Sequence, residues 1–384
     1  GMGCGQSKDV GEGPVGQPAN SKGPQQAPPE SPREKGKTKY DIEREKKREE
    51  RNSREMSRQT SLETSSGGGN EPPPPALTAE RSMQNDMADT GLTLEEAWEV
   101  DCLQAGRQEK LGKGSSGDVW LAVDTSYKAA SGRRFALKIV PITLKPSDMV
   151  PVVDQLRDLY SSRHPNVTAF HGAAYDSEMS TICIAFEYCD LKSLKDVLVH
   201  TKAMPENVLG NCALQVLRGL LYLHGERRIM HRDVKPSNVL VNSEGRFKIA
   251  DFGMSKELGD TLAAGQTWVG TSSYMSPERV GGLDYSFNAD VWSLGLLVFE
   301  CATGKPPYAG VNTFELLDQI VDGSPPQLQQ GQFSNEACDF VSLCLKKDHH
   351  ERPDCEILIT HPFLKKHRAV DVKGFLAKFD IPVA

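Results

Sequence analysis

A short stretch near the middle of the chain carries polar residues at close spacing. Asp233 is followed by Lys235 and Asn238, and a further aspartate, Asp251, stands 13 residues after Asn238. Aspartate and asparagine present hard oxygen atoms, which are the ligands that Mg²⁺ prefers. Together these are residue types that proton transfer, charge neutralisation and metal binding require. The rest of the sequence has to decide which reaction they serve.

A glycine-rich pattern, G-x-G-x-x-G-x-V, lies upstream at Gly112, Gly114, Gly117 and Val119. The glycines alone are a weak signal, because dinucleotide-binding folds share them. Here residues 119–123 and 134–140 read as two strands, so we expect the glycines in a hairpin rather than between a strand and a helix. Such a tip lets backbone N–H groups approach phosphates, and Lys138 on the next strand supplies positive charge for them.

The stretch from Ile229 to Leu240 resembles the catalytic loop of eukaryotic protein kinases, and Asp251-Phe252-Gly253 follows at the distance that this family requires. Any one of these residues could be an ordinary buried polar residue, but all of them in order favour the kinase interpretation over chance. The resemblance implies an α+β, bilobal protein kinase fold. It also implies transfer of the γ-phosphate of ATP to a protein hydroxyl.

The resemblance gives each polar residue a role. Asp233 would accept the proton of the substrate hydroxyl, and Lys235 would neutralise charge on the migrating phosphoryl group. Asn238 and Asp251 would hold Mg²⁺, while Lys138 would hold the α- and β-phosphates. The expected cofactors are therefore ATP and Mg²⁺. Lys235 at this spacing resembles kinases that act on serine and threonine.

The ATP pocket is placed by the same resemblance. Phe186 would close its back and Glu187-Tyr188-Cys189-Asp190 would form the hinge, although Phe186 is equally compatible with an ordinary aromatic at the end of an apolar strand. The residues expected to contact ATP are Leu111, Gly112, Gly114, Gly117, Val119, Ala136, Lys138, Glu187, Cys189 and Leu240. Glu278 and Arg352 are expected to form a structural ion pair, and Asp290 to support the catalytic loop.

Resemblance to the MAP kinase kinase family extends over about residues 105–366. It is closest in residues 229–243, 251–255 and 270–279, where general kinase motifs do not dictate the sequence. It implies a dual-specificity kinase that phosphorylates Thr and Tyr of a downstream MAP kinase and is activated by an upstream MAP kinase kinase kinase. Two alternatives stay open: another serine/threonine kinase of a signalling cascade, and a weakly active kinase fold that acts as a scaffold.

The activation segment lies between Asp251 and Glu278. Its Thr261 and Thr267 are separated by five residues, a spacing that resembles plant and protist members of the family. Phosphate on these threonines could order the segment by pairing with Arg232. Thr271 matches the loop threonine that lies near the catalytic aspartate, so we expect it to be positional rather than regulatory.

One position departs from the kinase pattern. Kinases pair the strand lysine with a glutamate on the helix of the small lobe, and alignment places Gln155 there, on one helical face with Val152, Leu156 and Leu159. No carboxylate then faces Lys138 directly, although Asp158 could substitute after a small rotation. An amide lacks the Coulomb attraction of an ion pair, so we expect a loosely held helix and low basal activity.

The expected architecture has three parts. Residues 1–100, rich in Gly, Pro, Ser and charge, are expected to be a disordered tail. The kinase domain, 105–366, would comprise a small lobe (105–188) of antiparallel sheet with one helix and a large, mainly helical lobe (191–366), with long helices at 211–224 and 290–302. Residues 367–384 form the C-terminal tail, and the amphipathic segment 363–379 would either dock an upstream kinase or simply pack.

Composition restricts the function classes. The net charge is −7, and the basic residues between positions 33 and 58 alternate with glutamate, so we expect no nucleic-acid binding. The nine cysteines are scattered without a C-x-x-C pair, which favours a reducing compartment and a cytoplasmic location. The longest apolar stretch, 294–299, is far short of the roughly 20 residues of a membrane-spanning helix.

The N-terminus matches a lipidation signal. A Gly before Met2 is typical of a cloning remnant, so we take Met2 as the natural start. Removal of Met2 would expose Gly3 in the pattern M-G-x-x-x-S for N-myristoylation, with Cys4 placed for palmitate. One myristoyl chain binds membranes only marginally, so a second anchor is needed. We expect attachment to the cytoplasmic face of a membrane, although a glycine-rich start can match this pattern by accident.

Overall fold

The computed structural model describes residues 99–114, 117–125, 132–142, 149–161, 163–252 and 272–383. All of them fall in one unit of the chain, residues 76–384. The tail predicted for residues 1–100 therefore lies outside the described residues, apart from its last two positions. So do the lipidation sites Gly3 and Cys4 and the threonines Thr261, Thr267 and Thr271.

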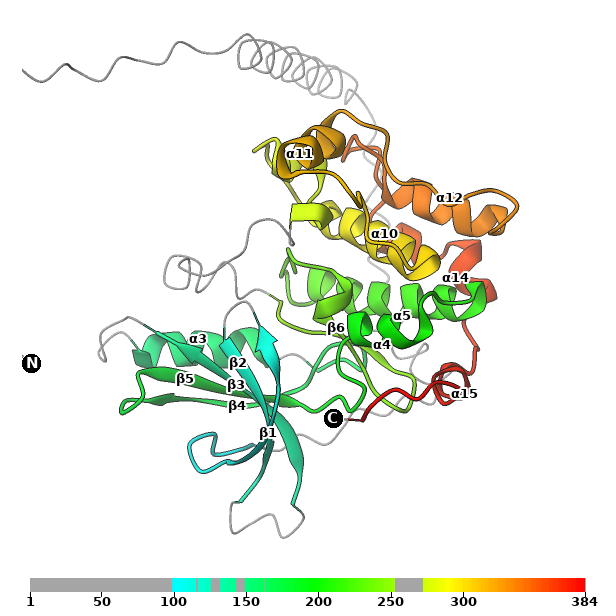
Figure 1. The fold of residues 1–384 in the computed structure, drawn as a ribbon. Coiled ribbons are helices and arrows are strands. Elements are labelled where there is room, and N and C mark those ends of the chain that lie inside the picture. The colour runs from blue at the N-terminus through cyan, green and yellow to red at the C-terminus, as the bar shows by residue number, and fades with distance from the viewer. Residues whose placement is uncertain are drawn as a thin grey trace, which may run out of the picture. The chain divides into compact units, whose positions relative to one another are not determined.

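The first part of the fold is a five-stranded antiparallel sheet (Figure 1). Its spatial order is β1-β2-β3-β5-β4, with β1 at Gly106–Gly114, β2 at Gly117–Val123, β3 at Arg134–Pro141, β5 at Thr181–Glu187 and β4 at Phe170–Asp176. All seven residues of β5 are buried, because this apolar strand has sheet on both sides and side chains on both faces. Helix α3, Met149–Tyr160, packs against β4.

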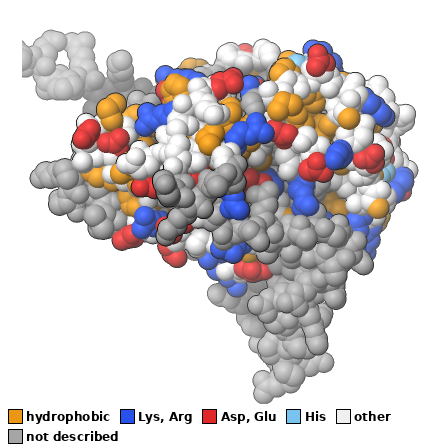
Figure 2. All heavy atoms as spheres, turned by 90° about the horizontal axis from the view of Figure 1, so that it is seen from below, with side chains coloured by type: hydrophobic (Ala, Val, Ile, Leu, Met, Phe, Trp, Pro, Cys, Tyr) orange, Lys and Arg blue, Asp and Glu red, His pale blue; other side chains and the backbone are white. Residues whose placement is uncertain are grey.

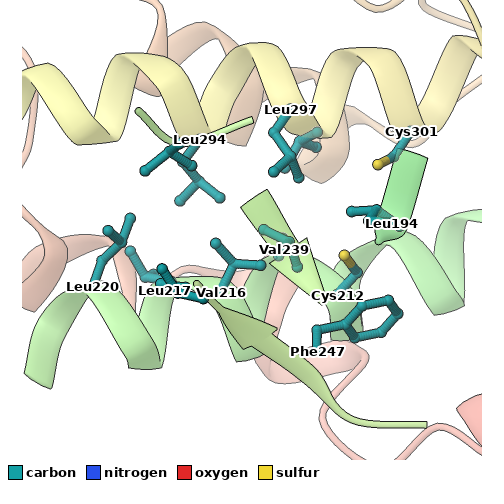
Figure 3. Close-up of a cluster of buried hydrophobic side chains, with 14 of the residues drawn as sticks. Leu194, Cys212, Val216, Leu217, Leu220, Val239, Phe247, Leu294, Leu297 and Cys301 are labelled. Atoms are coloured by element: carbon teal, nitrogen blue, oxygen red, sulfur yellow. The ribbon is translucent and has the colours of Figure 1, made fainter. Parts of the chain in front are cut away.

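The second part is mainly helical. Helix α5 (Glu206–Gly225) packs against α10 (Asn288–Thr303), and these two helices are longer than the sequence predicts. Twelve of the 16 residues of α10 are buried, as expected for a largely apolar helix in the interior of the domain. Figure 3 shows Leu217 and Leu220 of α5 pointing toward Leu294 and Leu297 of α10. These contacts form the floor beneath the catalytic loop.

Shorter elements complete this part. The hairpin of β6 (Val239–Val241) and β7 (Phe247–Ile249) joins the catalytic loop to Asp251. The remaining α-helices are α4 (Leu194–Thr201), α9 (Pro277–Val280), α11 (Thr313–Val321), α12 (Asn335–Cys344), α13 (Cys355–Leu358), α14 (Pro362–Lys366) and α15 (Val372–Leu376). The 3-10 turns η2 (Pro236–Asn238) and η3 (Ser272–Tyr274) lie between them.

Local sequence signals explain several boundaries. Ser193 and Asp196 form a capping box at the start of α4, and Asn312 and Glu315 form another at the start of α11. Gly304 ends α10 in the left-handed conformation that glycine adopts without strain. The predicted amphipathic segment 363–379 forms the two short helices α14 and α15, and both pack against α5.

The described surface carries mixed charge. On the face drawn in Figure 2, Lys and Arg side chains are interspersed with Asp and Glu and with apolar side chains. No helix in the described part of the chain is both long and apolar enough to cross a membrane. The α+β bilobal architecture predicted from the sequence is confirmed, with an antiparallel sheet in one lobe and helices in the other.

Candidate active site

A cavity of about 480 Å³ lies between the sheet and the helical part. Of the residues expected to contact ATP, its described lining includes Leu111, Gly112, Val119, Ala136, Lys138, Glu187, Cys189 and Leu240, but neither Gly114 nor Gly117. Lys235, Asn238 and Asp251 line the same cavity. Residues separated by more than 100 positions are thus brought together around a space with apolar walls and a polar floor.

The two glycines outside the lining lie at the turn of the β1–β2 hairpin. Gly114 pairs with Gly117 across the two strands, so the glycines do lie in a hairpin. A Cβ at position 117 would lie only 2.0 Å from the carbonyl oxygen of Ile139 on β3. By contrast, a Cβ at Gly112 would meet no atom within 4 Å. Gly117 therefore permits close strand packing, whereas Gly112 keeps the wall of the cavity free of a side chain.

Asp290 on α10 fixes the backbone of the catalytic loop. Its two carboxylate oxygens accept hydrogen bonds from the backbone N–H groups of His231 and Arg232, each at 2.8 Å. His224 Nε2 lies 2.8 Å from the same carboxylate. Burial alone would raise the pKa of Asp290, but the hydrogen bond and charge of His224 outweigh it and lower the pKa. A buried carboxylate thereby holds the loop in place, and Arg232 is held at a positive φ of 69°.

Asp233 lies in this loop with only part of its hydrogen-bonding capacity used. Lys235 Nζ donates to Asp233 Oδ2 at 2.7 Å, and Asn238 Nδ2 donates to the same oxygen at 2.8 Å. The other oxygen, Asp233 Oδ1, is buried and accepts no hydrogen bond from any residue that the structure describes. The site therefore holds one oriented carboxylate oxygen that can accept a proton.

Lys138 and Asp251 meet on the opposite wall. Lys138 is only 2% exposed, and its Nζ donates to Asp251 Oδ1 at 2.7 Å. Burial acts to raise the pKa of Asp251, but the nearby ammonium of Lys138 outweighs it and lowers the pKa. Asp251 adopts a positive φ of 61°. This backbone conformation is uncommon for a residue other than glycine and is found most often where function constrains the chain.

The helical face predicted for α3 is wrong at one position. Gln155 is exposed and makes no hydrogen bond to a described residue, whereas Val153, Leu156 and Tyr160 are buried. Tyr160 packs among aromatic rings, so the side of α3 that carries Tyr160 faces the interior. Gln155 lies on another side of the helix and points to solvent. Asp158 is exposed as well, so it does not substitute for the missing glutamate in this structure.

Two buried ion pairs stabilise the segments that surround the site. Arg352 contacts Glu278 through two nitrogen–oxygen pairs at 2.8 and 3.1 Å, as the resemblance implied. Lys248 on β7 lies 2.7 Å from Glu187 at the end of β5. The second pair was missed by sequence reasoning, because nothing local relates two residues 61 positions apart. It ties the hinge to the strand that leads into Asp251.

Further cavity residues were missed as well. They are Lys113, Thr168, Tyr188, Lys192, Ser193, Lys195, Asp196, Ser237 and Ala250, together with Phe186, which was expected at the back of the pocket rather than as an ATP contact. The capping signature of Ser193 and Asp196 was a usable signal, because it marks the start of α4 beside the hinge.

The sequence is similar to those of known proteins. Residues 106–364 match the protein kinase domain family. Mitogen-activated protein kinase kinase 2 of Arabidopsis thaliana is 43% identical over 264 residues, which cover 67% of this chain and 71% of that protein. Dual specificity mitogen-activated protein kinase kinase dSOR1 of Drosophila melanogaster is 39% identical, with 71% and 75% covered. Dual specificity mitogen-activated protein kinase kinase 1 of Dictyostelium discoideum is 46% identical over 198 residues, 52% of this chain and 29% of that protein.

The match to the kinase family spans more than half of the chain, and the Arabidopsis and Drosophila relatives are matched over more than two thirds of their own length. The resemblance to MAP kinase kinases that the sequence indicated is therefore confirmed. The chain belongs to the protein kinase family and, within it, to the MAP kinase kinases.

Proposed function

We propose that this chain transfers the γ-phosphate of ATP to the Thr and Tyr of the activation loop of a MAP kinase, and that an upstream kinase activates it by phosphorylating Thr261 and Thr267. Two of the relatives are named dual specificity kinases, which supports the two-residue target. The observation on which the proposal rests is the hydrogen bonding of the Asp233 carboxylate. One of its oxygens is held by Lys235 and Asn238, while the other is buried without a described partner.

The reaction at Asp233 needs little covalent help from the protein. The substrate hydroxyl oxygen forms a bond to the γ-phosphorus while the bond from that phosphorus to the β-phosphate oxygen breaks, which releases ADP. The hydroxyl proton passes to Asp233 Oδ1. Lys235, which lies 2.7 Å from Asp233, is placed to neutralise negative charge on the transferred group. Catalysis then rests on position and charge, as in other phosphoryl transfers.

The donor set suits Mg²⁺ beside the nucleotide. Asn238 uses its amide nitrogen to hold Asp233, and its amide oxygen accepts no hydrogen bond from the described residues. Asp251 adds a carboxylate on the wall of the same cavity. Amide and carboxylate oxygens are the ligands that Mg²⁺ takes. Bound there, the cation would neutralise charge on the phosphates of ATP, and Lys138 would hold the α- and β-phosphates.

Arg232 supports activation by phosphorylation. Its guanidinium Nε is buried and has no partner among the described residues, while its carbonyl oxygen accepts a hydrogen bond from Arg279 at 2.6 Å. A buried N–H donor of a charged group costs free energy unless it is paired. Phosphate on Thr261 or Thr267 would supply that pair next to the catalytic aspartate.

We also propose that Gly3 is myristoylated and Cys4 palmitoylated, which would hold the kinase at the cytoplasmic face of a membrane. The motif from Met2 to Ser7 supports this proposal. Expression of the chain starting at Met2, with an alkyne analogue of myristate, should label the protein, and Gly3→Ala should abolish the label. Equal labelling of both forms would contradict the proposal.

The test of the main proposal is mass-spectrometric mapping of sites on a catalytically inactive MAP kinase. The activated form would be Thr261→Glu/Thr267→Glu, and the matched control would carry Asp251→Ala in addition. Phosphate on both Thr and Tyr of the T-x-Y loop, absent in the control, is the expected result. Phosphate on Ser or Thr alone would favour another serine/threonine kinase of a signalling cascade. ATP binding without any transfer would favour a scaffold.

A further inference from the structure

Tyr160, the last residue of α3, lies in an aromatic cluster next to Asp251. Its ring centroid is 4.9 Å from that of Phe252, the residue that follows Asp251, and 4.9 Å from that of Phe186 at the back of the cavity. A third ring, Phe170, lies at 6.0 Å. Tyr160 is 1% exposed. Its ring is therefore a core residue, and packing alone would explain it.

Packing does not explain the hydroxyl. Tyr160 Oη is buried and forms no hydrogen bond with any residue that the structure describes. Burying an unpaired hydroxyl opposes folding, and native proteins leave few such groups. A phenylalanine would fill the same space without that cost. The hydroxyl is thus a spare hydrogen-bond donor held beside the cavity.

Asp251, which precedes the Phe252 that Tyr160 contacts and which pairs with Lys138, is close enough to act electrostatically on this hydroxyl. A phenol is protonated at neutral pH and can therefore donate. In this structure Lys138 Nζ donates to Asp251 Oδ1 at 2.7 Å. Gln155, which stands where the family places a glutamate for the lysine, is exposed.

We expect ATP binding to change the contacts that Lys138 and Asp251 make. If Lys138 holds phosphate groups, as proposed above, its ammonium is drawn away from Asp251, and Asp251 loses a donor that fixes its orientation. Asp251 must then stay oriented at the wall of the cavity to hold the cation. A neutral donor is suitable there, because it orients the carboxylate without competing for the positive charge that the phosphates need.

We propose that Tyr160 is a positioning residue for phosphoryl transfer: its hydroxyl donates to the Asp251 carboxylate the hydrogen bond that Lys138 gives up to the nucleotide. The inference rests on the proposed roles of Lys138 and Asp251. It extends them to a residue of α3 that neither the catalytic motifs nor the ATP-contact pattern includes. Helix α3 thus acts on the Lys138–Asp251 pair through Tyr160, while Gln155 on the same helix is exposed.

The experiment compares Tyr160→Phe with Tyr308→Phe. Tyr308 Oη is also buried without a described partner, but Tyr308 lies outside the aromatic cluster of Tyr160, Phe186 and Phe252, so its variant controls for removal of an orphan hydroxyl. Neither variant should lower the melting temperature. Tyr160→Phe should lower kcat by about ten-fold, the size expected for one hydrogen bond to a charged group, with KM for the protein substrate unchanged. Tyr308→Phe should leave kcat unchanged.

A binding measurement supplies a readout that does not depend on turnover. Calorimetry with a non-hydrolysable ATP analogue, with and without Mg²⁺, gives the gain in affinity due to the cation. Tyr160→Phe should reduce that gain by several-fold, whereas Tyr308→Phe should not. An unchanged kcat together with an unchanged gain in Tyr160→Phe would overturn the proposal, because the hydroxyl would then be packing only.

A double variant separates this inference from the proposed function. In a Gln155→Glu background, rotation of α3 would bring a carboxylate to Lys138 and draw its ammonium further from Asp251, so Tyr160→Phe should cost at least as much as in the wild-type background. A clearly smaller cost in the Gln155→Glu background would contradict the positioning role of Tyr160. Both assays use a generic protein substrate or no substrate. They therefore remain decisive even if no MAP kinase is phosphorylated.

Discussion

The catalytic loop lines the cavity, whereas helix α3 lies behind it against Phe186 and Phe252, and the two are held by different forces. Hydrogen bonds from His224, His231 and Arg232 converge on the buried Asp290 and fix the loop in direction as well as position. Helix α3 is fixed by the aromatic rings around Tyr160 and by side-chain hydrogen bonds near its C-terminal end, from Arg157 to Ala173 O on β4 and from Arg227 to Asp158 O. Apolar contacts are not directional.

The contrast separates two tasks. Asp233 and Asn238 require a fixed geometry, and they lie in the loop that charged hydrogen bonds hold. Apolar contacts can slide and repack without breaking a directional bond, so they leave α3 freer to shift than the loop. The large lobe therefore provides the rigid chemistry, and the small lobe the adjustable part. The predictions below test this division, beginning with the most rigid contact.

Arg352→Ala should be the most damaging single change to stability. It leaves Glu278, which is 2% exposed, as an unpaired buried charge, a situation that typically costs about 3–5 kcal/mol. Urea denaturation measures the loss. Lys373→Ala is the matched control, because its ion pair with Glu244 is exposed and is worth less than about 1 kcal/mol. Similar losses in the two variants would contradict the assigned bracing role of the buried pair.

Asp290→Asn should damage catalysis more than binding. The amide keeps the shape of the side chain but offers one accepting oxygen where the carboxylate accepts from both His231 and Arg232. We expect kcat to fall by roughly 100-fold, since hydrogen bonds to charged groups contribute about 1.5–3 kcal/mol each. KM for ATP should change little. A large rise in KM with an unchanged kcat would show that the loop is not held by Asp290.

Gly117→Ala tests how closely strands β2 and β3 of the small lobe must pack. The added Cβ would lie 2.0 Å from the carbonyl oxygen of Ile139, so β2 and β3 must separate, at a cost of about 1–3 kcal/mol. KM for ATP should rise because the hairpin above the cavity shifts. Gly112→Ala, which meets no atom within 4 Å, should leave stability nearly unchanged. Equal stability of the two variants would mean that the hairpin adjusts freely.

Much of the site could be predicted because its signals are local. The catalytic loop, the glycine hairpin and the strand that carries Lys138 are each encoded within about ten consecutive residues, and the structure brings them around one cavity. The antiparallel sheet followed from alternating strands and from the family resemblance.

Other features depend on distant parts of the chain. The Glu187–Lys248 pair joins two separate strands, and no local pattern predicts it. The orientation of Gln155 depends on which ring fills the space beside Phe186 and Phe252. A helical pattern gives the periodicity of a face, but residues only one position apart, such as Leu159 and Tyr160, compete to define its centre. The larger ring prevails here.

Gln155→Glu is expected to have the smallest effect, and it gives the most specific test of whether α3 can rotate. In this structure position 155 points to solvent, so a glutamate reaches Lys138 only if α3 rotates. An ion pair worth about 1 kcal/mol would raise the population of the rotated helix, and with it the activity of the unphosphorylated kinase, about five-fold. Gln332→Glu, at another exposed position, controls for the added charge. If basal activity stays unchanged in Gln155→Glu, the missing carboxylate does not limit this kinase. If activity rises and Tyr160→Phe still costs about ten-fold in that background, α3 rotates as expected, and the hydrogen bond from Tyr160 to Asp251 is needed even when Lys138 has a carboxylate partner.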